Sequence, residues 1–89
     1  MLTREGDTLK IAGPMNIESA ASLLQQSSGQ LSGVTHVDLA GVTEVDSAAI
    51  SLLLEWRRQA QNGALRFSNL PAALSSLADL YGVAELIPQ

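Results

Sequence analysis

Short segments that alternate polar and apolar residues constrain the fold of this chain most strongly. Residues 8–12, 36–40 and 65–68 each show this alternation, which is typical of a strand with one buried face. Helical patterns separate and follow these segments, so the strands should be joined by parallel crossovers. Because each strand keeps a polar face, we expect helices on one face of the sheet and water on the other. The sequence therefore predicts a two-layer α/β domain rather than a doubly wound nucleotide-binding fold.

Apolar residues at helical spacing, bounded by capping residues, predict the helices. A first helix should follow Asn16, a plausible N-cap, and end near residues 27–29. Its expected apolar face consists of Ile17, Ala20, Ala21 and Leu24. A second helix should run from about Ser47 to Gln61, before an Asn62-Gly63 turn.

Turn residues set the other boundaries. Gly13-Pro14 should end the first strand, and residues 41–46 should form a loop. A third helix should open at 69–71, with Pro71 in its first turn, and close at Gly82. Its expected apolar face consists of Leu70, Leu74, Leu77, Ala78 and Tyr81.

Length and composition exclude several classes of protein. The 89 residues predict one domain, 1–89. The chain has no Cys and a single His, which argues against thiol chemistry, a His-based metal centre and most Ser-His-Asp sites. Nine acidic against five basic residues, a net charge of −4, argue against nucleic-acid binding. The sequence has neither a membrane-spanning apolar run nor an apolar signal core, so we expect a soluble, cytoplasmic protein.

The second helix carries more apolar residues than one buried face needs. Its expected core face consists of Ala49, Leu52, Leu53, Trp56 and Ala60. Ile50 and Leu54 project toward the far side of the helix. Together with Ser47, Ser51 and Arg58 they would form a surface patch that suits the docking of another protein. The alternative is that Ile50 and Leu54 pack under the neighbouring helices of a small core.

Asp46 and Ser47 stand at the start of this helix. One of them should be the N-cap, whose side chain accepts a hydrogen bond from an otherwise unpaired backbone N–H. A hydroxyl at this place would also be open to modification. Phosphate on Ser47 would add roughly −1.5 to −2 charge beside Glu44 and Asp46. The helix could tolerate that charge, while a partner fitted to a neutral surface would not.

Residues 46–50, preceded by Val37-Asp38-Leu39, resemble the STAS domain family, whose hallmark is Asp-Ser/Thr-small-Gly-hydrophobic at a helix start. The resemblance covers about residues 8–88 and is nearest to the MlaB type, the small STAS subunit of the Mla phospholipid-transport ABC system. It implies a mixed, mostly parallel sheet with helices on one face, and no cofactor. Ala49 stands where the family usually has Gly, and Asn16 where its first turn usually has Asp.

The resemblance also implies a function. The chain would be a non-enzymatic module that binds the cytosolic, MlaF-like ATPase subunit of such a transporter through Ser47, Ile50, Ser51, Leu54 and Arg58. It would then work at the cytoplasmic face of the inner membrane without inserting into it. The alternative is an anti-sigma-factor antagonist regulated by phosphorylation at Ser47, the residue that matches the family's phosphorylatable position.

Two further classes receive less support. An enzyme would need paired carboxylates such as Asp38, Glu44 and Asp46, but the last two suit loop and cap roles, and His36 lies near no nucleophile in the sequence. Direct binding to an anionic membrane is disfavoured because the chain is itself negatively charged.

Overall fold

The structure, a computed structural model, describes residues 2–60 and 65–87. These residues form the elements β1 (Leu2–Glu5), β2 (Thr8–Met15), α1 (Ile17–Ser27), β3 (His36–Val45), α2 (Ser47–Gln59), β4 (Arg66–Ser68), α3 (Ala72–Leu80) and the short 3₁₀ helix η1 (Ala84–Leu86). The predicted helix end at Gln61 and the Asn62-Gly63 turn lie outside the described residues. In the described part of the chain, no helix is long and apolar enough to cross a membrane.

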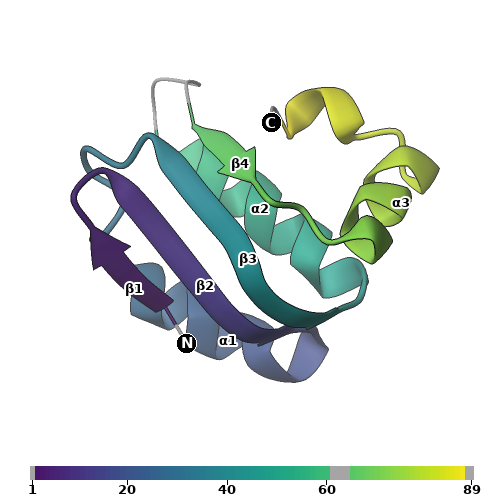
Figure 1. Cartoon of the computed structure of the whole chain (residues 1–89), viewed down its shortest axis with the longest axis horizontal. Coiled ribbons are helices and arrows are strands. Elements are labelled where there is room, and N and C mark those ends of the chain that lie inside the picture. The colour runs from purple at the N-terminus through teal and green to yellow at the C-terminus, as the bar shows by residue number, and fades with distance from the viewer. Residues whose placement is uncertain (1, 61–64, 88–89) are drawn as a thin grey trace.

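The strands form a mixed, mostly parallel sheet in the order β1-β2-β3-β4. Strand β1 pairs with β2 antiparallel, whereas β2 with β3 and β3 with β4 are parallel. In Figure 1 the sheet faces the viewer, with α1 and α2 behind it and α3 beside α2. The predicted two-layer α/β class, with helices on one face of the sheet, is confirmed.

The core lies between the sheet and the helices. Its largest fully buried side chains are Trp56, Phe67, Leu9, Ile11, Met15, Leu23, Leu39, Leu52, Leu53, Leu65, Leu74 and Val37. Neighbouring positions such as Lys10, His36 and Arg66 are exposed, because successive side chains of a strand point to opposite faces. The predicted polar face of the sheet is therefore confirmed.

Strands β2 and β3 are longer than predicted. Gly13-Pro14 does not end β2, and residues 41–45 belong to β3. The two strands pair as far as Met15 and Val45, with register shifts between Lys10 and Ala12 and between Gly13 and Pro14. Irregular pairing accommodates a proline that cannot donate to the ladder. The strand β1 was not predicted at all; it turns into β2 at Gly6, whose φ is +60°.

The caps of α1 are as predicted, but its buried face is not. Ile17 is 77% exposed and Ala21 is also exposed, whereas Leu23 and the polar Ser27 are buried. The Ser27 hydroxyl accepts a hydrogen bond from Trp56 Nε1 at 2.8 Å and donates one to Leu24 O at 2.9 Å. This paired hydroxyl lets the helix turn a serine toward the core.

Helices α2 and α3 follow their patterns more closely. Ala49, Leu52, Leu53 and Trp56 are buried, as expected for α2. Helix α3 begins at Ala72, so Pro71 lies at its N-cap rather than in its first turn. Gly82 follows the helix with a φ of +69°, as a C-terminal glycine does. Tyr81, predicted on the apolar face, is 53% exposed.

Candidate partner-binding surface

The starts of α1 and α2 are joined by the side chain of Asp46. Its Oδ1 accepts from Ala48 N at 2.8 Å, which caps α2, and its Oδ2 accepts from Ile17 N at 3.0 Å, in the first turn of α1. The predicted N-cap at this position is Asp46. One carboxylate therefore fixes two helix starts that are far apart in the sequence.

Asn16 strengthens this junction. Its Oδ1 accepts from the backbone N–H groups of Glu18 and Ser19, both at 3.0 Å, and its Nδ2 donates to Glu44 Oε1 at 3.3 Å. An aspartate, the residue that the sequence resemblance to STAS domains leads us to expect here, has no such donor and would face Glu44 as a second carboxylate. The departure from the family pattern thus adds a contact between α1 and the end of β3.

The five predicted contact residues divide between surface and core. Ser47, Ser51 and Arg58 are exposed. Ile50 is buried at 5% exposure, and Leu54 packs partly buried against the core. The expectation that Ile50 projects into solvent is therefore wrong, and the alternative, that it packs in the core, is correct. The physical reason is that α3 packs against α2 and encloses its flank.

A hollow opens over the N-terminal half of α2. It has a volume of about 500 Å³ and is lined by Ile17, Ser47, Ala48, Ile50, Ser51 and Tyr81. We call it the Ser47 hollow. Ile17 comes from the start of α1 and Tyr81 from the end of α3, and both are among the exposed large apolar residues of the described chain. Sequence patterns assigned both residues to the core, so they missed the apolar walls of this surface.

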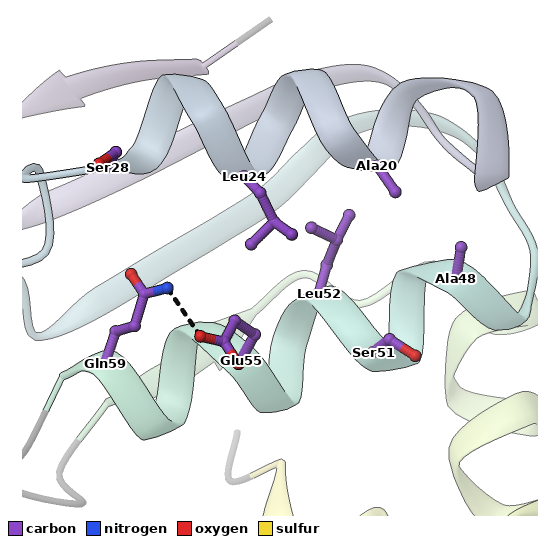
Figure 2. Close-up of a pocket in the computed structure, with 8 residues that line it drawn as sticks. All are labelled: Ala20, Leu24, Ser28, Ala48, Ser51, Leu52, Glu55 and Gln59. Atoms are coloured by element: carbon purple, nitrogen blue, oxygen red, sulfur yellow. Dashed lines mark hydrogen bonds between the residues drawn. The ribbon is translucent and has the colours of Figure 1, made fainter.

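A groove lies next to the Ser47 hollow, between α1 and α2. It has a volume of about 450 Å³ and is lined by Ala20, Leu24, Ser28, Ala48, Ser51, Leu52, Glu55 and Gln59. Figure 2 shows Ala20 and Leu24 of α1 pointing toward Ala48 and Leu52 of α2. We call it the α1–α2 groove. It shares Ala48 and Ser51 with the Ser47 hollow, so the two adjoin along α2, and we refer to them together as the depression.

Arg58 is not a free positive charge at this surface. Its guanidinium donates to both carboxylate oxygens of Glu55, and Gln59 Nε2 donates to Glu55 Oε2 at 2.8 Å. Arg58 and then Gln59 lower the pKa of the Glu55 carboxyl, and Glu55 in turn raises the pKa of Arg58. The far end of the α1–α2 groove therefore carries a paired, nearly neutral set of charges.

The carboxylates considered for catalysis are engaged in the fold. Asp46 holds two helix starts and Glu44 binds Asn16, as described above. Asp38 Oδ1 accepts from Ala40 N and from Asn69 Nδ2, both at 2.9 Å, on the open face of the sheet. Within residues 2–60 and 65–87, no group of three or more His, Cys, Asp or Glu side chains could hold a metal ion.

Comparison with known proteins places the chain in a family. The family described as "Mlab, STAS domain" matches residues 1–88. The chain therefore belongs to the STAS domain family, and the family model that it matches is of the MlaB type.

One similar solved structure is titled "Structure of the Anti-Sigma Factor Antagonist SpoIIAA in its Unphosphorylated Form". It aligns with a TM-score of 0.70 and 15% identity, covering 98% of this chain and 84% of that chain. At this identity the likeness shows a shared fold alone. A search of curated proteins found no match.

Proposed function

We propose that this chain is a non-enzymatic module that binds the ATPase subunit of a phospholipid-transport ABC complex of the Mla type and supports its assembly or activity. The MlaB-type family match supports the choice of partner. Membrane proximity would follow from the complex, at the cytoplasmic face of the inner membrane.

The observation that carries this proposal is the apolar wall of the Ser47 hollow. Ile17 is mostly exposed and Tyr81 is about half exposed. Both line the hollow together with Ser47 and Ser51 of α2. Large apolar side chains around a depression are typical of protein interfaces. A stable contact would cover about 800 Å² of the chain, so it would extend beyond the hollow onto Leu54 and Arg58.

Co-purification of the full chain with the ATPase subunit tests the proposal. Ser51→Arg places a long cation at the point shared by the hollow and the groove, and we expect it to abolish co-purification. Ala40→Arg, an exposed position on the open face of the sheet, is the matched control and should leave the complex intact. Absence of a complex with the unaltered chain would refute the proposed partner.

A second candidate is an anti-sigma-factor antagonist controlled by phosphorylation at Ser47. One observation favours it: the Ser47 side chain is exposed at the first position of α2, and no hydrogen bond holds its hydroxyl among the described residues. Incubation with a serine kinase of the anti-sigma type and ATP, followed by mass spectrometry, decides between the two. A phosphate on Ser47 would favour the antagonist.

A further inference from the structure

The shape of the depression points to the kind of partner segment that fills it. The Ser47 hollow and the α1–α2 groove extend along α2 from Ser47 to Gln59. At 1.5 Å per residue this is roughly 18 Å, or about three turns of a helix. Small side chains at Ala20, Ala48 and Ser51 line the depression, so another backbone could approach closely.

The depression offers no backbone partner to an extended strand. It lies between helices, whose backbone groups bond within each helix. At the two helix starts, Ile17 N and Ala48 N bond to Asp46, and Glu18 N and Ser19 N bond to Asn16. A helix satisfies its own backbone hydrogen bonds and needs only a complementary side-chain surface. Because these backbone N–H groups already donate to Asp46 and Asn16, they are not available to bind an anion.

Charge is distributed unevenly along the elements that meet at the Ser47 hollow, which are the starts of α1 and α2 and the end of α3. Glu18 follows Ile17, Asp79 stands two residues before Tyr81, and Glu44 and Asp46 precede Ser47. The five Lys and Arg residues of the chain lie elsewhere: Arg4, Lys10, Arg57, Arg58 and Arg66.

These cations are too distant to balance the acids. Arg57 and Arg58 lie in the last turn of α2, about 15 Å from Ser47. In the sheet, Lys10 stands opposite Asp38 and Arg66 opposite His36, both near the start of β3. At about 3.3 Å per residue, Asp38 lies roughly 23 Å from the end of β3 at Val45. These distances exceed the Debye length of roughly 8 Å at physiological salt. The end of the molecule that carries Ile17 and Tyr81 is therefore acidic.

We propose that the partner contributes an amphipathic helix, whose apolar face fills the Ser47 hollow and the α1–α2 groove and whose flanks carry Lys or Arg complementary to the acidic end of the chain, to which Glu18 and Asp79 contribute. This inference rests on the proposed function for the existence of a protein partner at this surface, and it adds the chemistry of the segment that binds. Opposite charges around an apolar centre speed association and reject acidic competitors.

Two synthetic helical peptides test the inference without the partner itself. They share one apolar face, and one has Lys and the other Glu at its flanks. Each is titrated into the isotopically labelled full chain while the amide signals of Ser47, Ser51 and Tyr81 are followed by NMR. We expect the Lys peptide to shift these signals and to bind at least about tenfold more tightly at low salt, with the difference shrinking as salt rises.

Charge reversal at the acidic end of the protein gives a second arm of the test. Glu18→Lys and Asp79→Lys, singly and together, should weaken the Lys peptide and strengthen the Glu peptide. The control Glu5→Lys alters an exposed acid on β1, outside the depression, and should leave the preference unchanged. Circular dichroism shows whether each variant keeps its fold.

The outcomes separate the two proposals. Equal affinity for both peptides, no binding of the Lys peptide, or shifts confined to the open face of the sheet would overturn the basic helix. If Glu18→Lys and Asp79→Lys leave co-purification with the ATPase unchanged, the basic helix is also overturned, while the proposed function stands. If the ATPase does not bind but the peptides are discriminated as expected, the proposed function fails and the inference survives.

Discussion

Asp46 accepts a hydrogen bond from Ile17 N at 3.0 Å, although the two residues are 29 positions apart. With its other oxygen the same carboxylate caps its own helix at Ala48 N. This arrangement sets the start of α1 beside the start of α2. It also holds Ile17 at the wall of the Ser47 hollow, so the shape of the surface depends on one side chain.

Two substitutions of Asp46 distinguish the contributions of its hydrogen bonds with Ala48 N and Ile17 N to stability. Asp46→Ala removes both, and we expect it to lower the free energy of unfolding by about 2 kcal/mol. Asp46→Ser keeps one acceptor for the cap, so its loss should be about 1 kcal/mol smaller. Urea titration measures both. If Asp46→Ser were as stable as the unaltered chain, the bond to Ile17 would contribute nothing to stability.

The buried pair of Trp56 and Ser27 predicts a second stability effect. Ser27→Ala leaves Trp56 Nε1 buried without an acceptor, which should cost about 2 kcal/mol. The control Ser22→Ala removes an exposed hydroxyl that only accepts from Gln26, and should cost less than about 0.5 kcal/mol. Similar urea midpoints for the two variants would contradict this role of Ser27.

Asp38 predicts a dependence of stability on pH. Hydrogen bonds from Asn69 and then from Ala40 lower the pKa of Asp38 below its ordinary value of 3.8. The ionised form is therefore favoured by folding. Its contribution is complete above the ordinary pKa and is lost as the pH falls through the lowered value.

Asn69→Gly tests this contribution, because glycine keeps the positive φ of 58° at this position while removing the amide. We expect a loss of less than about 1 kcal/mol at pH 7, since the site is only partly buried. The pH-dependent part of the difference in unfolding free energy between this variant and the unaltered chain should decrease below pH 3.8. Chemical unfolding at several pH values measures it, and a difference that grows in acid would refute the assignment.

The walls of the Ser47 hollow should matter for binding and not for folding. Ile17→Ser and Tyr81→Ser each remove exposed apolar surface, so stability should change by about 0.5 kcal/mol or less. We expect each to weaken binding of the ATPase subunit by at least about tenfold, as interface aromatic and aliphatic anchors do. Calorimetric titration gives the affinities. Unchanged affinity in both variants would exclude these walls from the interface.

Substitutions at Ser47 distinguish shape from modification. Ser47→Ala should keep partner binding, because the hydroxyl makes no hydrogen bond within the described residues and Asp46 supplies the cap. Ser47→Glu should abolish co-purification, since it places a charge in the hollow. Loss of binding in Ser47→Ala with an intact fold would instead indicate that the hydroxyl contacts the partner or must be phosphorylated.

Local chemistry made the helix starts predictable. Asn16 and Asp46 have short side chains that accept from backbone N–H groups two or three residues ahead, and both are N-caps in the structure. Likewise Gly82 follows α3 in the left-handed conformation that its position suggests. These features depend on neighbours in the sequence and need no knowledge of the rest of the chain.

The burial of residues on each helix face was less predictable where another helix packs against it. Ile17 and Tyr81 fit apolar stripes yet lie at the surface, and Ile50 lies outside the main stripe yet is buried. Helical spacing locates residues around one helix, but burial depends on what packs against it. The Ser47 hollow, formed by α1, α2 and α3 together, could therefore not be read from any single segment.

The sequence by itself determined the two-layer class, the polar face of the sheet and the caps, because periodicity and capping act over a few residues. Only the tertiary structure decided that β2 and β3 continue to Met15 and Val45, because strand pairing overrides local turn preferences. It also decided that Ser27 is buried against Trp56 and that Ile17 meets Asp46. Such contacts join residues far apart in the chain, and their energies exist only once the layers have packed.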